Sequence, residues 1–468
     1  MGREKIINYI LFPVIILLAI FWYGASLDLT EAKDFYWTLK LILVGSVNIG
    51  LCFALIFNFE KTKPFIPYVL AFYIAMTGFT YEFKPDYFTS ANEVLTAALL
   101  IIWITRKLLV RRGPSIKNYF SKNVIIFLLC AGVGILTAYL GFRVTSLNIF
   151  MELKSYTLYI FYLFLIPDCV RSEKELGKII SFTLMASLIA LYFGVTSSMS
   201  PQTSEQARLS LIGWGTLNVL VGYILPLFFI AFGFLLQKRS AGYKLLLLVY
   251  MNIIIYLLFL SQTRSGWGAL VAGTFLFMFL VKRRALAFAI SMVLVIGFIF
   301  LPAGEKATEI FTHRIVGQTI NPDDSLQERY SRWEGAWATA KAYPLTGSGW
   351  GGVLPLFWDG SVGNTSALFL PLWHNGYLEI LSQLGFPGLL AFLLLWGIIL
   401  KKEGFRLYRA SRSQQSMISV GLFVAVVACL IFALGEQQFY RIETASHTYF
   451  LAGLLLASGN IAKRETEK

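Results

Sequence analysis

The sequence predicts an all-α membrane protein: a polytopic bundle of about 12–14 transmembrane helices with one long extramembrane loop that contains amphipathic helices. Hydrophobic residues make up 57% of the 468-residue chain, and charged residues make up only 14%. Apolar runs of about 20 residues, the length that crosses a bilayer, recur from one end of the chain to the other. Lys and Arg cluster in the turns between alternate runs, which is the pattern that sets topology in membrane proteins.

The apolar runs define the candidate spans and place both termini in the cytoplasm. Fourteen runs are candidates. A count of twelve or thirteen spans remains open because the run 65–80 is short and the run 265–281 follows its predecessor almost without a break. The candidate spans are residues 6–23, 35–59, 65–80, 88–105, 123–142, 147–168, 176–199, 211–236, 243–262, 265–281, 285–302, 376–400, 414–436 and 443–461.

The basic clusters mark the cytoplasmic turns. They are RKLLVRRG at 106–113, RSEKE at 171–175, QKRS at 237–240, KRR at 282–284, KKEGFR at 401–406 and KRETEK at the end of the chain. This distribution accounts for most of the net charge of +14, so the predicted partner is the lipid bilayer and not a nucleic acid. The first apolar run follows Arg3 and Lys5 without a small-residue cleavage site, so it is expected to be a signal anchor.

The four cysteines do not predict a disulfide framework or a zinc site. Cys52, Cys130, Cys169 and Cys429 lie in spans or at a cytoplasmic end, and none has a CxxC partner. They are interpreted as packing residues. No metal and no cofactor is predicted.

One long polar interruption divides the chain into three parts. These are an N-terminal part of the bundle (1–302), an outer loop (303–375) and a C-terminal part of the bundle (376–468). The other outer connections are short, whereas a loop of about 70 residues is too long for a simple turn and is typical of a functional or lid-like segment. Charged residues inside spans are costly and usually face a partner or a cavity. Those predicted here are Lys40, Glu93, Glu152, Lys154 and Glu379, of which Glu152 and Lys154 are expected to be structural.

An amphipathic helix is predicted over 325–343 within this loop. Ser325 is a suitable N-cap with Glu328 three residues later, and Pro344 and Gly347 end the helix. Its expected apolar face consists of Leu326, Tyr330, Trp333, Trp337 and Ala340. Arg329 and Arg332 are surface neighbours. They point either to lipid phosphates from a helix at the membrane interface or into a cavity that holds an anionic substrate.

Two further features follow the predicted helix. GSGWGG at 347–352 is expected to form a tight irregular turn, because no strand precedes it as a dinucleotide fingerprint requires. His374 lies where the loop re-enters the bundle, with Glu379 about one turn further on. A single histidine at an interface is usually structural, but a neutral imidazole in this position can also accept a proton from a hydroxyl group.

Two arginines outside the loop lie on the same outer side. Arg208 precedes the 211–236 span, and Arg264 occupies the turn between two spans. Arginine at the edge of an apolar bundle is costly unless it binds an anion, and its fork fits phosphate oxygens. Together with Arg332 and His374, these residues suit a lipid diphosphate donor, with cations stabilising the leaving group and a base activating an acceptor hydroxyl.

The region from about 200 to 400 resembles the O-antigen ligase/polymerase superfamily of integral membrane glycosyltransferases. Its most specific motif is HNGYLEILSQLGFPGLLAFLLLW at 374–396. The other motifs are Arg208 with Gly213 and Asn218, the Thr-Arg-Ser turn at 263–265, and RYSRW at 329–333 followed by Pro344 and a Gly-x-Gly.

The resemblance implies a metal-independent enzyme in the bacterial inner membrane with its site on the periplasmic face. The implied donor is a glycan on undecaprenyl diphosphate, and the acceptor is a sugar hydroxyl on lipid A-core or on another lipid-linked repeat. By position, His374 looks like the catalytic base, Arg208 and Arg332 like diphosphate-binding residues, and Arg264 like a support for them. Arg329, Trp333, Asn375 and Glu379 are expected to assist. Ligase is the leading expectation, repeat-unit polymerase the alternative, a lipid-linked glycan flippase less favoured, and a scaffold least favoured.

Overall fold

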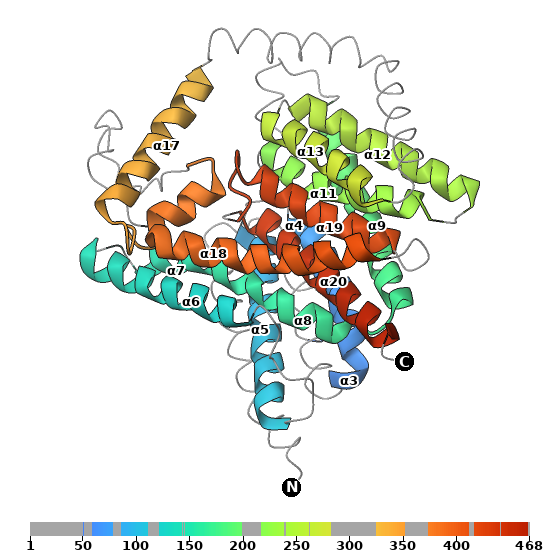
Figure 1. Cartoon of the computed structure of the whole chain (residues 1–468), viewed down its shortest axis with the longest axis horizontal. Coiled ribbons are helices and arrows are strands. Elements are labelled where there is room, and N and C mark those ends of the chain that lie inside the picture. The colour runs from blue at the N-terminus through green and yellow to red at the C-terminus, as the bar shows by residue number, and fades with distance from the viewer. Residues whose placement is uncertain are drawn as a thin grey trace, which may run out of the picture.

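The computed structural model describes residues 50, 59–77, 86–110, 121–142, 144, 146–198, 217–237, 240–261, 263–281, 324–351, 373–410, 416–439 and 441–466. All the regular elements in these ranges are helices (Figure 1). They are α3 (Phe59–Thr62), η1 (Lys63–Phe65), α4 (Ile66–Thr77), α5 (Asp86–Val110), α6 (Ser121–Leu136), η3 (Thr137–Gly141), α7 (Ser146–Thr157), η4 (Leu158–Phe161), α8 (Tyr162–Cys169), α9 (Glu173–Ser198), α11 (Leu217–Leu235), α12 (Ala241–Ser261), α13 (Arg264–Leu280), α17 (Asp324–Ala342), α18 (Gly376–Arg409), α19 (Met417–Phe432) and α20 (Ile442–Thr466).

The predicted all-α membrane bundle is confirmed. Five of the described helices are long and apolar enough to cross a membrane: Ser121–Gly141, Glu173–Tyr192, Asn218–Leu235, Ala241–Ser261 and Gly376–Arg409. Two shorter apolar helices, Arg264–Leu280 and Met417–Phe432, pack among them. The run predicted as one span over 147–168 is divided into α7, the 3-10 turn η4 and α8. The candidate spans 6–23 and 285–302 and nearly all of 35–59 lie outside the described residues, so the total count stays a prediction.

The centre of the bundle is the crossing of α11 and α19. Glycines allow the two backbones to approach closely, because a Cβ at Gly233 would lie 2.5 Å from the Met417 carbonyl oxygen. A Cβ at Gly421 would likewise lie 2.7 Å from the Phe229 carbonyl oxygen. The helix α12 packs against α11, α13 packs mainly against α19, and α20 packs against α8. The crossing helices α11 and α19 carry the candidate site at the other end of the pair, where α11 begins and α19 ends.

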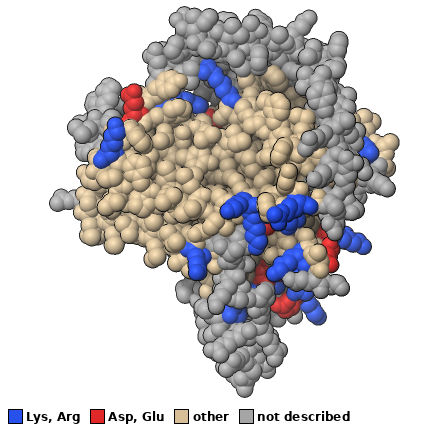
Figure 2. All heavy atoms as spheres, viewed as in Figure 1, with Lys and Arg blue, Asp and Glu red and all other residues tan. Residues whose placement is uncertain are grey.

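The two ends of the bundle differ in charge. In the view of Figure 2, most of the described Lys and Arg side chains gather around the end that holds α3 and the C-terminus, and a broad, largely uncharged band separates them from the few at the other end. Asp168 ties this basic end together, since it pairs with Lys63 at 3.4 Å and with Lys107 at 3.3 Å. The arrangement agrees with basic turns on one membrane side.

The charged pair within the spans is satisfied internally. Lys154 on α7 donates to Glu93 on α5 at 2.6 Å. An opposite charge offsets the cost of burying each group, as expected for intramembrane charges. Lys40 and the side chain of Glu152 lie outside the described residues.

Residues 344–351, hereafter the glycine loop, dock against a break in α18. At Gly385 the backbone has φ +66°, and Pro387 has no N–H to donate to the Gln383 carbonyl four residues earlier. The glycine loop supplies the missing donors, because Ser348 N and Gly349 N donate to the Ser382 and Gln383 carbonyls, each at 2.9 Å. In return, Phe386 N donates to the Pro344 carbonyl at 2.9 Å. The broken helix and the loop therefore complete each other's backbone hydrogen bonds.

The far end of the glycine loop is anchored on α6. Trp350 is fully buried, its indole N–H donates to the Ala131 carbonyl at 2.8 Å, and its backbone N–H donates to the Gly134 carbonyl at 3.3 Å. Gly349 has φ +76°, and a Cβ there would lie 2.3 Å from Ala138 N. The predicted tight irregular turn is thus confirmed over its described residues, and its glycines are required by close backbone contact.

Candidate functional site

The helix predicted over 325–343 is α17, and its first residue corrects one expectation. Because α17 begins at Asp324, Ser325 lies inside the helix, and its assignment as the N-cap was wrong. An acidic residue in the first turn of a helix is favourable to the helix dipole, which agrees with a helix that includes Asp324. The helix ends at Ala342, two residues before Pro344, as expected.

The face of α17 that packs against protein consists of small residues, of which only Ala340 belongs to the predicted apolar face. Gly335, Ala336, Thr339 and Ala340 are buried, and α17 packs against α18. Of the predicted apolar face, Ala340 is buried and Trp333 half-buried, whereas Tyr330 and Trp337 are exposed. Small residues let helices approach closely in membranes, and large aromatic residues favour the interface. The amphipathic pattern of α17 therefore has its small residues toward protein and its largest apolar residues outward.

Two predicted site residues of α17 form hydrogen bonds with the residues that follow α19 and precede α18. The Arg329 guanidinium donates to the Gly435 carbonyl at 3.0 Å and to Glu436 Oε1 at 2.9 Å. The Trp333 indole N–H donates to the Trp373 carbonyl at 2.9 Å, directly before His374. Arg332 is half-buried and neighbours Arg329 on the same helix. α17 is thereby held over the start of α18.

The His-Asn-Gly-Tyr motif clamps the start of α18 onto the end of α19. Asn375 is the N-cap of α18, since its Oδ1 accepts from Tyr377 N and Leu378 N at 3.0 and 3.1 Å. Its Nδ2 donates to the Leu434 carbonyl at 2.8 Å, Gly376 N donates to the Ala433 carbonyl at 2.9 Å, and the Tyr377 hydroxyl donates to the Leu430 carbonyl at 2.8 Å. The motif thus satisfies terminal carbonyls of α19 and fixes the residue before it.

The residue fixed in this way is His374. Its backbone has φ +50°, the left-handed region that a side chain other than glycine rarely adopts. Such conformations cost free energy and persist only where surrounding contacts enforce them, as the clamp does here. The imidazole Nδ1 lies 3.7 Å from Glu436 Oε2, and the His374 side chain is 30% exposed.

Glu436 is the centre of the site. Its side chain is only 8% exposed, and its Oε1 accepts from Asn218 Nδ2 at 2.8 Å as well as from Arg329. The Asn218 Oδ1 in turn accepts from the Thr263 hydroxyl at 2.7 Å. These five residues (Asn218, Thr263, Arg329, His374 and Glu436) are hereafter the Glu436 network. It joins α11, the start of α13, α17, the start of α18 and the end of α19.

Three predicted site residues remain: Arg264, Glu379 and Arg208. Arg264 is half-buried at the first position of α13, between Thr263 of the network and Ser265. The Cβ of Ser265 packs close to Gly435, since a Cβ added to that glycine would lie 2.7 Å from it. Glu379 is 2% exposed in the first turn of α18, and its backbone N–H donates to the Asn375 carbonyl at 3.0 Å. Arg208 lies outside the described residues.

Sequence reasoning missed Glu436 and gave Asn218 and Thr263 only as part of a motif. The available signal was a single carboxylate in the Gly-Glu-Gln-Gln run that ends the 414–436 span. A polar run at a span end is normally solvated, and only the contact with residues more than 100 positions away gives Glu436 its role.

A comparison with protein families identifies this region. Residues 249–393 match the O-antigen ligase family. The match confirms the resemblance seen in the sequence over the segment from α12 to the middle of α18. It covers Thr263, Arg264, Arg329, Arg332 and His374, whereas Asn218 and Glu436 lie outside the matched O-antigen ligase segment. A search among curated proteins gives no significant match.

The O-antigen ligase match and the helices together give the general class of the protein. It is a multi-pass membrane protein, and the family supports a glycosyltransferase-like activity of the O-antigen ligase or polymerase type on lipid-linked glycans.

Proposed function

We propose that the protein is an O-antigen ligase that transfers a glycan from undecaprenyl diphosphate to a sugar hydroxyl of lipid A-core at the periplasmic face of a bacterial inner membrane. The observation that carries the proposal is the carboxylate–imidazole arrangement within the Glu436 network. Glu436 Oε2 faces His374 Nδ1, while its other oxygen is held by Asn218 and Arg329.

His374 is the proposed catalytic base. A carboxylate beside one ring nitrogen of a histidine favours the proton on that nitrogen and leaves a lone pair on the other. In the proposed reaction His374 Nε2 takes the proton of the acceptor hydroxyl. The acceptor oxygen forms a bond to the anomeric carbon, and the bond from that carbon to the diphosphate oxygen breaks with its electron pair. The 3.7 Å separation from Glu436 suits a resting site, since catalytic hydrogen bonds often shorten when substrate binds.

Arginines are proposed to hold the leaving group. Arg208, Arg264 and Arg332 bind the diphosphate and neutralise its developing charge, which is the role a metal ion would otherwise take. The scheme is accordingly metal-independent. Arg329 is a positioning residue, and its two hydrogen bonds to the end of α19 support that assignment.

Transfer by purified protein in liposomes, with a lipid-linked glycan donor and a lipid A-core acceptor, tests the proposal. We expect His374→Ala to abolish transfer while the protein accumulates normally, and we expect a chelator to have no effect on the parent enzyme. His447→Phe is the matched control, because His447 is buried against Tyr223 on α11 with ring centroids 4.5 Å apart. Full activity of His374→Ala would refute the mechanism.

Product analysis in cells tests the acceptor. If the protein is a ligase, cells that lack its gene will have lipid A-core without glycan and will accumulate lipid-linked polymer. Single repeats on the acceptor would instead identify a repeat-unit polymerase and reject the ligase assignment.

A further inference from the structure

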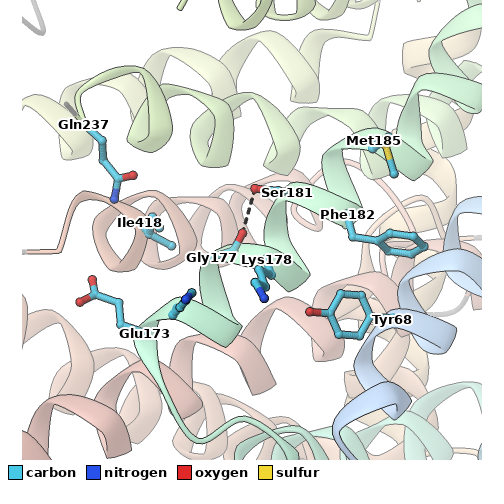
Figure 3. A pocket seen from close by; sticks show the side chains of 10 residues that line it. Tyr68, Glu173, Gly177, Lys178, Ser181, Phe182, Met185, Gln237 and Ile418 are labelled. Carbon is cyan, nitrogen blue, oxygen red and sulfur yellow. Dashed lines mark hydrogen bonds between the residues drawn. The ribbon is translucent and has the colours of Figure 1, made fainter. Parts of the chain in front are cut away.

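A pocket of about 760 Å³ lies at the basic end of the bundle, opposite the Glu436 network (Figure 3). Residues of α4, α9 and α19 and the end of α11 line it. It has two parts: a polar mouth with Glu173, Lys174 and Lys178, and an apolar wall that includes Tyr68 and Phe182, whose rings meet edge to face at 5.5 Å.

The mouth of the pocket carries a net positive charge. Lys174 and Lys178 are four residues apart on α9, so their side chains are neighbours on one face of the helix. Both are exposed, and neither forms an ion pair with a carboxylate in the part of the chain that the structure describes. Glu173 offsets one of the two charges, which leaves a net charge that a single phosphodiester would neutralise.

The face of α9 below the lysines changes from charged to apolar along its length. Met185, Leu188 and Tyr192 continue the face at helical spacing, and all three are exposed. In a membrane protein, exposed apolar side chains face acyl chains. The ten helical steps from Lys178 to Leu188 rise about 15 Å, which is half of a hydrocarbon core of about 30 Å. The pocket and this face therefore match one lipid leaflet in two respects: a charged region is followed by an apolar one, and the apolar region is about as long as one layer of acyl chains.

We propose that this pocket binds an anionic phospholipid of the leaflet at the basic end, with its phosphodiester between Lys174 and Lys178 and an acyl chain along Phe182, Met185 and Leu188. A lipid explains the continuity of the charged mouth with a lipid-facing stripe, which a soluble phosphate would not use. The ammonium groups select a headgroup with net negative charge, as basic side chains do at membrane surfaces.

Native mass spectrometry of the full-length protein in detergent, titrated with phosphatidylglycerol, tests the proposal. We expect the Lys174→Gln/Lys178→Gln variant to lose about tenfold in lipid occupancy. The matched control is Lys401→Gln/Lys402→Gln, which removes the same charge from exposed positions on α18 at the same end and leaves occupancy unchanged. If the pocket variant does not accumulate, Lys178→Gln alone carries the test, with an expected loss of about threefold.

Three results would overturn the proposal. They are unchanged occupancy in the pocket variants, an equal loss in the control, and binding of phosphatidylcholine as strong as that of phosphatidylglycerol. Binding of glycerol phosphate as strong as that of the lipid would also reject the acyl-chain part of the site.

Discussion

The glycine loop and the Glu436 network both hold α17 against the bundle, but they are built from different groups. The glycine loop binds mainly through backbone N–H and carbonyl groups, and its Trp350 is fully buried. The Glu436 network binds mainly through charged and polar side chains, and its His374 stays partly exposed. Backbone contacts in a closed interface give rigidity, whereas side-chain charges beside an exposed imidazole suit chemistry. The comparison therefore assigns architecture to the glycine loop and reactivity to the network.

The largest expected effect is that of a side chain in the glycine loop. Gly349→Val should prevent docking, because a left-handed conformation costs about 1–2 kcal/mol for a residue with a side chain. The new Cβ would in addition lie 2.3 Å from Ala138 N. We expect loss of folded protein, measured by fluorescence-detected gel filtration after extraction from membranes. Gly397→Val on α18 is the control, since a Cβ there would have no atom within 4 Å apart from its chain neighbours and the backbone of its own helix. Normal amounts of an active Gly349→Val protein would contradict the architectural role.

The second effect separates activity from folding. Glu436→Gln keeps an oxygen acceptor but removes the charge that faces Arg329 and His374. A hydrogen bond to a charged group contributes about 1.5–3 kcal/mol, so we expect a roughly 10- to 100-fold loss of transfer at unchanged protein level.

The control for Glu436→Gln is Glu403→Gln. Glu403 is also buried and pairs with an arginine, Arg406, at 2.8 Å, but it lies at the basic end of α18. Equal losses of activity in the two variants would show that the Glu436 network acts only through stability.

The smallest expected effect is at the edge of the network. Thr263→Val removes the hydrogen bond to Asn218 Oδ1, and one neutral hydrogen bond contributes about 1 kcal/mol. We expect transfer to fall about fivefold, measured in the same liposome assay. Thr274→Val is the control, because the Thr274 hydroxyl donates within its own helix, to the Leu270 carbonyl at 2.8 Å. A loss as large as that of Glu436→Gln would mean that the threonine contacts the substrate directly.

The sequence was most informative where local patterns decide the structure. Hydropathy placed α9, α12 and α13 to within about three residues, and Pro344 marked the end of α17. Hydropathy did not show which side of α17 packs against protein, because large apolar residues are accepted by lipid and the membrane interface as well as by a protein core. Tyr330 and Trp337 are exposed for that reason.

Contacts between residues far apart in the chain could not be predicted from the sequence. Pro387 and Gly385 in the α18 segment are consistent with a break, but nothing local shows that residues 348 and 349 complete it. In the same way, His374 was recognisable from its position at the start of a span, whereas Glu436 depends on contacts with three other helices.

The docking of Trp350 on α6 has a consequence for how the protein is made. The indole binds the Ala131 carbonyl across 219 residues of chain. At about 5–20 residues per second, a ribosome needs roughly 10–40 s to synthesise that interval. During this time the surface of α6 around Gly134 is not yet covered by the segment that contains Trp350. Glu436 emerges later still, so the reactive end of the protein is assembled only when almost the whole chain has left the ribosome.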